Sequence, residues 1–247
     1  MTTDLAGRTQ SDAQSSVVRV ICTATNLGGT GFLHRSGRVI TAAHVVAGCS
    51  ERQVVVLTWT RRTFAATVVA DQKRDLALIT PTDPINGRSF PISSYRTIPI
   101  GSAVISWGFP AGYTGRTPLL TLGYLAGHDS VKLDSAIAEQ WVINAAFNGG
   151  NSGGPVLDVE TGAVIGVVSG KLAPLPDEIE SILKALKAND SGLNYTGVTA
   201  EGEKVTLSES QMLERVLEYL RSQTQLVVGY AVSLSDLRKF LAEQHLE

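Results

Sequence analysis

The sequence has few of the residues that define special classes of protein. It contains only two cysteines, Cys22 and Cys49, among its 247 residues. Two cysteines are too few for the disulfide framework of a small secreted domain, so we expect both to be buried free thiols. The longest apolar runs stay below eighteen residues, which excludes an ordinary membrane-spanning helix and predicts no membrane partner.

Neither sign of charge is in large excess. The 21 Lys and Arg residues nearly balance the 23 Asp and Glu residues, for a net charge of −2. The sequence has no basic stripe that would indicate a nucleic acid, and no polybasic segment that would indicate an anionic membrane surface. Residues 1–16 lack the apolar stretch of a secretory signal. We expect a flexible N-terminus and a cytoplasmic protein, or a periplasmic or secreted protein if a leader has been removed.

Residues 17–80 contain six short segments rich in Val, Ile, Leu and Thr, separated by glycine and charged residues. Their length and β-branched content are typical of strands. In order they are VVRVICTAT, GTGFLH, RVITAA, QVVVLTWT, FAATVVA and LALIT. Residues 81–100 carry four prolines and show no period, which indicates a connector between domains.

A second series of six strand-like segments occupies residues 101–171 and 226–232. Six strands, a connector and six more strands fit two closed antiparallel barrels better than an alternating βαβ protein. The sequence therefore predicts an all-β fold of two six-stranded antiparallel β-barrels. The segments of the second barrel are SAVISWGF, LLTLGYLAG, QWVINAAF, GGPVLDV, AVIGVVSG and LVVGYAV.

Residues 172–225 interrupt the second barrel with a pattern of helical period. Two capping pairs, Asp177 with Glu180 and Ser208 with Gln211, each precede apolar residues spaced along one helical face. We predict an inserted pair of amphipathic helices, joined by a polar link over residues 190–207. These faces are Ile179, Ile182, Leu183 and Leu186 in the first helix, and Met212, Val216, Leu217 and Leu220 in the second.

The last residues, 233–247, predict a C-terminal helix. Ser233 can cap its N-terminus, and Leu237, Phe240 and Leu241 fall on the face that would pack inward.

Three motifs carry residues suited to nucleophilic catalysis. A serine hydroxyl becomes a strong nucleophile when a base removes its proton and a third group holds that base. His44 closes a strand among small residues, where it is either such a base or a buried structural histidine. Asp75 directly precedes the apolar strand Leu76–Ile79, where it either orients a base or ends a turn, and Asp71 is a competing carboxylate.

The third motif, Gly149 to Pro155, reads GGNSGGP. Its glycines allow Ser152 to project while the amides of Gly150 and Ser152 converge on one point, which suits an oxyanion. A phosphate-binding loop would need a lysine after the glycines and a helix behind them. A hydrolase nucleophile elbow also needs a helix, whereas Pro155 begins a strand here.

The order and spacing of TAAH, DLALI and GNSGGP resemble the trypsin-like serine proteases. The resemblance covers residues 17–241 apart from the helical insertion, and it implies the fold described above. It also implies that His44 is general base and then acid, that Asp75 orients the imidazole, and that Ser152 is the nucleophile. Gly150 and Ser152 would supply the oxyanion amides, and no cofactor or metal is implied.

Within that superfamily the chain is most similar to the HtrA (Deg) group, although no segment of PDZ length follows and the helical pair is extra. Asn151 stands where digestive enzymes carry an aspartate that pairs with a new N-terminus. The resemblance therefore implies that activation needs no N-terminal cleavage.

Family register also implies a pocket for the substrate residue that precedes the scissile bond. No acidic residue is among its members, which disfavours Arg or Lys there and predicts small or medium aliphatic residues such as Val, Ala or Leu. The six positions are Ala146, Phe147, Ser169, Gly170, Lys171 and Val228.

Two questions of function remain open in the sequence. The alternatives to a serine endopeptidase of protein or peptide substrates are an esterase, and an inactive protease scaffold that binds peptides or proteins. The inserted helices are either a lid, a substrate filter or a docking surface for a regulatory partner, or plain decoration of the barrel.

Overall fold

The computed structural model describes residues 11–25, 27–50, 53–95, 97–133, 136–171, 177–189, 192–198, 202, 204–223 and 227–246. The chain divides into two compact units. The first, the two-barrel unit, comprises Met1–Leu172 and Val227–Glu247. The second, the insertion, comprises Ala173–Leu226.

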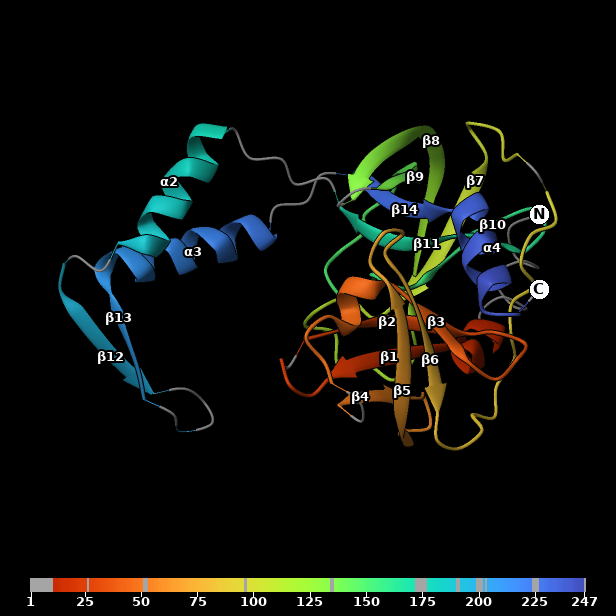
Figure 1. Ribbon diagram of the computed structural model, residues 1–247, viewed down its shortest axis with the longest axis horizontal. Helices are drawn as coiled ribbons and strands as arrows, with labels where there is room; N and C mark the ends of the chain where they lie inside the picture. Colours follow the sequence, from red (N-terminus) through yellow and green to blue (C-terminus); the bar gives the residue numbers. More distant parts are fainter. Residues whose placement is uncertain are drawn as a thin grey trace. The chain divides into compact units, whose positions relative to one another are not determined.

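The first barrel contains all six strands expected between residues 17 and 80. It closes in the order β1-β2-β3-β6-β5-β4, and every neighbouring pair is antiparallel (Figure 1). A short 3-10 helix, η1 (Ala43–Val46), follows the third strand and carries His44. The strands are β1 (Val17–Cys22), β2 (Leu27–Leu33), β3 (Val39–Thr41), β4 (Val54–Leu57), β5 (Thr63–Asp71) and β6 (Leu76–Pro81).

The second barrel closes in the order β10-β11-β14-β9-β8-β7. Its last strand follows the insertion in sequence and pairs with both β11 and β9. It therefore completes the second barrel, as predicted. The two barrels confirm the predicted all-β, trypsin-like fold class. The strands are β7 (Ala103–Gly108), β8 (Leu119–Leu133), β9 (Ala136–Asn144), β10 (Pro155–Asp158), β11 (Val164–Lys171) and β14 (Gly229–Ser233).

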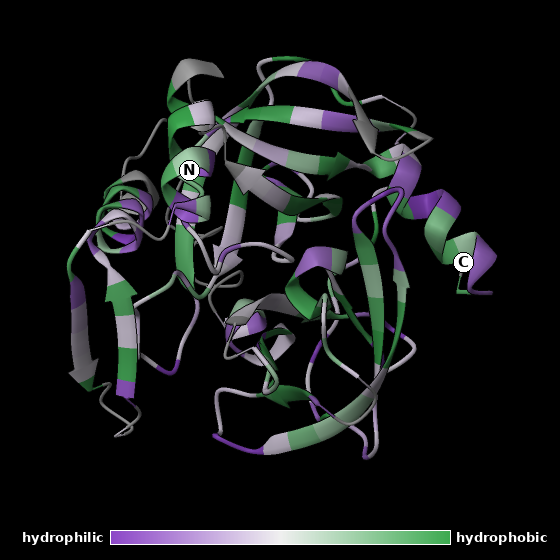
Figure 2. Cartoon of the chain, turned by 60° about the vertical axis from the view of Figure 1, so that its left-hand side comes forward, coloured by the Kyte–Doolittle hydropathy of each residue, from purple (hydrophilic) through white to green (hydrophobic). Residues whose placement is uncertain are grey.

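A hydrophobic cluster joins the barrels and the C-terminal helix α4 (Leu234–Glu243). Phe32 and Leu78 enter it from the first barrel and Trp107 from the second. As expected, Ser233 caps the helix by accepting a hydrogen bond from Asp236 N at 3.2 Å. Figure 2 shows apolar and polar residues alternating along this helix near the C-terminus. Its buried face is Leu237, Phe240 and Leu241.

The insertion contains the two expected helices, α2 (Asp177–Ala188) and α3 (Glu209–Gln223). The expected polar link over 190–207 is wrong in part, because β12 (Asn194–Val198) and β13 (Lys204–Ser208) form an antiparallel hairpin there. These strands are mostly exposed. A hairpin of this kind is held by main-chain pairing and by contacts such as Thr196 Oγ1 to Thr206 Oγ1 at 3.0 Å. Few of its side chains are buried, so its sequence lacks the alternation of buried and exposed residues that predicts a strand.

The predicted capping pair of α3 is present and reciprocal. Gln211 N donates to Ser208 Oγ at 3.3 Å, and Ser208 N donates to Gln211 Oε1 at 3.1 Å. The side chains of the other pair, Asp177 and Glu180, lie outside the described residues. Most of the apolar helix faces stay exposed, with Leu183 as the buried exception; the exposed members are Ile179, Ile182, Met212, Val216, Leu217 and Leu220.

The expectation of two free thiols is wrong. Cys22 at the end of β1 and Cys49 after η1 form a disulfide, with their Cα atoms 5.8 Å apart. This separation is normal for a disulfide. The two cysteines lie 27 residues apart in sequence, so only closure of the barrel brings them together.

The prediction of a flexible N-terminus covers residues 1–16, of which residues 1–10 lie outside the described part of the chain. Residues 11–16 are helical, with Ala13 and Ser16 fully buried, because Ala13 belongs to the cluster between the barrels. Within the described part of the chain, no helix has the length and apolar character needed to cross a membrane.

Candidate active site

His44 and Asp75 meet at the rim of the first barrel. Asp75 directly precedes β6, which pairs with β3, the strand ahead of η1. The imidazole Nδ1 lies 2.9 Å from both carboxylate oxygens, and the backbone N–H of His44 donates to Asp75 Oδ1 at 3.0 Å. The His44 side chain is 48% exposed and that of Asp75 is 13% exposed. His44 is therefore no buried structural histidine.

This contact fixes which imidazole nitrogen can act as a base. An ionised carboxylate only accepts hydrogen bonds, so Nδ1 must carry the proton that it shares with Asp75. In the neutral ring, Nε2 then holds the free lone pair. The atom that could take a proton points away from Asp75.

Asp75, rather than Asp71, is the carboxylate that contacts His44. Asp71 instead receives hydrogen bonds from Arg74 Nε at 2.5 Å and from Lys73 N at 2.9 Å. Asp75 has a φ of +54°, a left-handed conformation that aspartate adopts more readily than most residues. Three donors surround its carboxylate, the third being Ser169 Oγ at 2.6 Å.

The loop that carries Ser152 needs glycine at two positions. Gly150 and Gly153 have φ values of +87° and +85°. A Cβ on Gly150 would lie 2.5 Å from Phe109 O, and one on Gly153 would lie 2.1 Å from Thr30 O. Both the backbone conformation and the available space therefore exclude a side chain.

Thr30 in β2 links the first barrel to this loop. Its backbone N–H donates to Ser152 O at 2.8 Å, and its buried hydroxyl donates to Gly150 O at 2.7 Å. The same hydroxyl accepts a hydrogen bond from Phe109 N at 2.9 Å. One residue of the first barrel thus holds the loop and an adjoining segment of the second barrel.

Ser169 connects the acid and the serine. It lies at an irregularity in the pairing of β11 with β14, between Val168 and Gly170, and such bulges reorient side chains. Its hydroxyl donates to Asp75, while its carbonyl accepts a hydrogen bond from Ser152 Oγ at 3.1 Å. Among the hydrogen bonds of the described residues, none joins Ser152 Oγ to His44.

The Gly150 amide is directed outward from the loop. Gly149 O accepts a hydrogen bond from Ala111 N at 2.7 Å. The peptide is trans, so the Gly150 N–H points away from Ala111. The amides of Gly150 and Ser152 donate to no other group in the described part of the chain.

The residues expected around the specificity pocket are brought together by β9, β11 and β14. Phe147 is 2% exposed and packs on Gly229, where a Cβ would lie 2.2 Å from the ring. Ala146, Ser169, Gly170 and Val228 are half-buried. The backbone of Lys171 pairs with Gly229, and its side chain lies outside the described residues.

Sequence reasoning missed Thr30 altogether and assigned Ser169 only to the pocket wall. A threonine within a strand carries no local signal, and the contacts of Thr30 with Gly150 and of Ser169 with Asp75 span 120 and 94 residues. Around the site, and elsewhere in the described residues, no three His, Cys, Asp or Glu side chains cluster to hold a metal ion.

The family described as the trypsin-like peptidase domain matches residues 29–167. Protease Do-like 1, chloroplastic, from Arabidopsis thaliana is 33% identical over 153 residues, which cover 59% of this chain and 34% of that protein. The serine protease Do-like HtrA from Bacillus subtilis is 33% identical over 170 residues, which cover 66% of this chain and 36% of that protein. The chain thus spans about a third of the length of these relatives.

Solved structures show a similar fold. The Rv3671c protease of M. tuberculosis in its inactive form has a TM-score of 0.63 and 22% identity, covering 98% of this chain and 93% of that one. The HtrA-type protease AlgW with a tripeptide has a TM-score of 0.62 and 19% identity, covering 100% of this chain and 64% of that one.

Proposed function

The chain belongs to the trypsin-like peptidase family, and from this we propose that it is a serine endopeptidase with Ser152 as its nucleophile. One observation carries the proposal. Ser169 contacts both the carboxylate that holds His44 and the hydroxyl of Ser152. The base, its orienting acid and the nucleophile are therefore gathered around a single residue, as acyl transfer requires.

The reaction follows from these positions. His44 Nε2 takes the proton of Ser152 Oγ as that oxygen attacks the carbonyl carbon of the scissile peptide. Amides of Gly150 and Ser152 stabilise the resulting oxyanion. The imidazolium then gives its proton to the leaving amine as the C–N bond breaks. A water molecule, deprotonated by His44, then attacks the acyl carbon. The bond to Ser152 Oγ breaks as the imidazolium returns its proton to that oxygen, which releases the carboxylic acid product and restores the enzyme.

The hydroxyl of Ser152 must turn before this reaction begins. It donates to Ser169 O in the structure, and rotation about χ1 to another staggered position redirects it toward His44. Catalytic hydrogen bonds often tighten only when substrate binds. We infer that substrate binding favours the productive rotamer.

Specificity is proposed for small or medium aliphatic residues before the scissile bond, such as Val, Ala or Leu. Its support is the apolar wall that Phe147 and Val228 provide, with no carboxylate among the proposed pocket residues. Each methylene discriminates by about 1–3 kcal/mol in such a pocket. Profiling with a peptide library tests this, and a predominance of cleavage after Arg or Lys would refute it.

A fluorophosphonate probe tests the proposed nucleophile directly. We expect the wild-type chain to be labelled and the Ser152→Ala variant to remain unlabelled, with turnover lower by about 10⁶-fold. His44→Ala should give a similar loss because the base is removed. Ser235→Ala, which changes an exposed serine on α4, is the matched control and should be labelled like wild type.

A second candidate function is a protease scaffold that binds peptides without cleaving them. The hydrogen bond of Ser152 Oγ to Ser169 O, in place of His44, favours it. The same probe distinguishes the two functions. A folded wild-type chain that is never labelled, yet binds peptides as well as Ser152→Ala does, would support the scaffold and refute the endopeptidase.

We propose further that the protein works in an oxidising compartment, such as the periplasm or the exterior, instead of the cytoplasm. The Cys22–Cys49 disulfide supports this. Maleimide labelling of the protein in intact cells tests this proposal. Oxidised cysteines stay unlabelled until a reductant is added, whereas immediate labelling would indicate a cytoplasmic protein.

The insertion is proposed as a substrate filter or docking surface for a regulatory partner. Its support is the apolar face of the helices, in which Ile182 is 52% exposed and Val216 is 53% exposed. Apolar helix faces are normally covered by a partner.

A further inference from the structure

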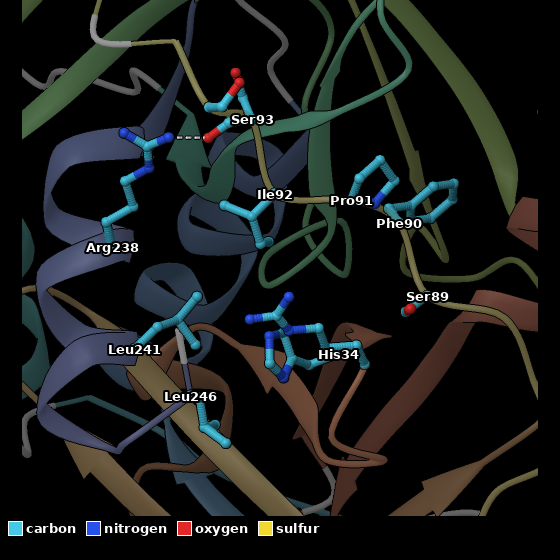
Figure 3. A pocket seen from close by; sticks show the side chains of 11 residues that line it. His34, Ser89, Phe90, Pro91, Ile92, Ser93, Arg238, Leu241 and Leu246 are labelled. Carbon is cyan, nitrogen blue, oxygen red and sulfur yellow. Dashed lines mark hydrogen bonds between the residues drawn. The ribbon is translucent and has the colours of Figure 1, made fainter.

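A cavity of about 600 Å³ lies in the two-barrel unit, and no residue of the proposed triad lines it. Its walls come from three segments: the turn that follows β2, residues 89–94 of the connector, and the C-terminal helix with Leu246 beyond it (Figure 3). Cavities of this volume hold small organic ligands. The site therefore has the size to bind a molecule of its own.

Two arginines place positive charge on the cavity wall. Arg35 and Arg238 both line it, and no described residue around it carries a carboxylate. Arg238 donates to the backbone oxygen of Ser93 across the cavity edge (Figure 3). A guanidinium has five N–H groups, so this bond leaves Arg238 with donors for a ligand. Hydroxyls of Ser89, Ser93 and Ser94 add further polar contacts.

The acidic residues of α4 are engaged elsewhere. Asp236 accepts hydrogen bonds from Glu139 N at 2.9 Å and from Lys239 Nζ at 3.0 Å. Glu243 pairs with Arg74. Both carboxylates of the helix are therefore paired with other residues. Within the described residues, Arg238 bonds to a backbone oxygen and has no acidic partner.

His34 presents an unused donor to the same cavity. It is 5% exposed, and its Nδ1 accepts a hydrogen bond from Ser36 N at 3.3 Å. The neutral ring therefore carries its proton on Nε2, which makes no hydrogen bond with a described residue. Burial lowers the pKa of His34, and the nearby Arg35 and Arg38 lower it further. Figure 3 shows the ring between the connector and α4.

The rest of the wall is apolar. Phe90, Pro91 and Ile92 contribute it from the connector, and Leu241 and Leu246 from the opposite side. A fully hydrated anion such as inorganic phosphate would leave these side chains without a contact. A ligand with one charged end and an apolar body matches both parts of the wall.

We propose that this cavity binds an amphipathic carboxylate, with the carboxylate held by Arg35, Arg238 and His34 and the apolar body packed on the connector and α4. Guanidinium groups pair with carboxylates through two parallel hydrogen bonds. The carboxylate can belong to a small organic acid or to the C-terminus of a peptide, because the cationic wall recognises the same group in both.

Isothermal titration of the Ser152→Ala chain tests this binding without any need for catalysis. The probes are 4-phenylbutyrate, its neutral amide, inorganic phosphate, and acetyl-Gly-Leu as the free acid and as the amide. We expect at least one free acid to bind, and its amide to bind at least tenfold more weakly. The acid that binds more tightly shows whether the site takes a small organic acid or the C-terminus of a peptide. Equal binding of acid and amide, binding of phosphate alone, or no binding would overturn the proposal.

Variants locate the site. Arg238→Gln and Arg35→Gln should each weaken binding of the acid about tenfold, which is one charged contact of about 1.4 kcal/mol. Arg88→Gln removes an exposed arginine of the connector that does not line the cavity, and should bind as the parent does. If both cavity variants retain their melting temperature and bind with unchanged affinity, the assignment is wrong.

Protonation gives an independent readout. A bound carboxylate raises the pKa of His34 against the lowering effect of burial, Arg35 and Arg38. Binding should therefore take up a proton and tighten as the pH falls. Titrations in buffers of different ionisation enthalpy measure this uptake. His34→Gln should abolish it, and a pH dependence that survives this substitution would contradict the role of His34.

Discussion

At the scale of single residues, Thr30 shows how one buried hydroxyl can couple two barrels. It is fully buried and bonds both to Gly150 O and to Phe109 N. Each of those backbone groups would be left unpaired without it. Such a group costs about 1–3 kcal/mol when it is buried. The geometry of the Ser152 loop therefore depends on a residue of the other barrel.

Replacing Thr30 with valine, which has the same shape without the hydroxyl, tests this coupling. We expect Thr30→Val to lower the free energy of unfolding by about 1–3 kcal/mol. We also expect fluorophosphonate to label Ser152 more slowly, by about tenfold. Thr67→Val, at an exposed position of β5, is the control and should change neither quantity. Normal labelling of a destabilised Thr30→Val would show that the hydroxyl stabilises the fold without positioning the loop.

His34 predicts how stability depends on pH. Its pKa is lowered in the folded protein, chiefly by burial, so the unfolded chain binds a proton first as the pH falls. Stability should therefore decrease below about pH 6.5, the ordinary histidine value, and level off below the folded pKa. Urea unfolding from pH 5 to pH 8 measures this. The difference between wild type and His34→Gln isolates the effect, and a difference that does not vary with pH would refute it.

At the scale of elements, the disulfide ties the end of β1 to the segment after η1. Cys22 is the last residue of β1, and Cys49 follows the short helix that carries His44. Each end of the segment between them is thereby anchored to the first barrel. His44, the proposed base, lies within the segment that the disulfide closes.

Breaking this disulfide should destabilise the first barrel. In the chain-entropy description, releasing a loop of this length costs about 3–4 kcal/mol. We expect dithiothreitol to lower the urea midpoint of the wild-type protein by a corresponding amount. The double variant Cys22→Ala, Cys49→Ala should start at the lower midpoint and show no response to the reductant. A wild-type midpoint that reduction leaves unchanged would contradict the stabilising role.

At the scale of the whole molecule, the insertion leaves and re-enters the two-barrel unit at adjacent points. Lys171 in β11 and Gly229 in β14 are direct partners in an antiparallel pair. Paired residues in such strands lie about 5 Å apart, so a tight turn can join them. The two-barrel unit also contains both closed barrels and the helix between them. We expect it to fold without residues 173–226.

Replacing residues 173–226 with an Asn-Gly turn tests the role of the insertion. The shortened chain should keep its melting temperature and the fluorophosphonate labelling of Ser152. Under the filter or docking proposal, cleavage of a folded protein substrate should change by tenfold or more, while cleavage of a short peptide stays the same. The full chain with Val216→Glu, which changes the exposed apolar face of α3, is measured with the same two substrates. Unchanged turnover of both substrates would leave the insertion as a surface feature of the barrel.

The sequence by itself determined the features that local patterns encode. Short segments rich in Val, Ile, Leu and Thr predicted all twelve barrel strands, and Ser233 with Leu237 and Phe240 predicted the C-terminal helix. The order of His44, Asp75 and the Ser152 motif predicted the residues of the candidate site. The strands, the helix cap and each single motif lie within a few consecutive residues, because strand period, helix caps and glycine conformations are local properties. The roles of His44, Asp75 and Ser152 were implied by the order of the three motifs, which resembles that of the trypsin-like proteases.

Only the tertiary structure decided which distant residues meet. The Cys22–Cys49 bond, the hold of Thr30 on Gly150, the rotamer of Ser152 against Ser169 and the cavity beside His34 all join separate segments. Two strands can have ideal patterns and still leave their cross-barrel neighbours unspecified. Those neighbours follow from barrel closure and side-chain packing, which depend on the whole chain at once.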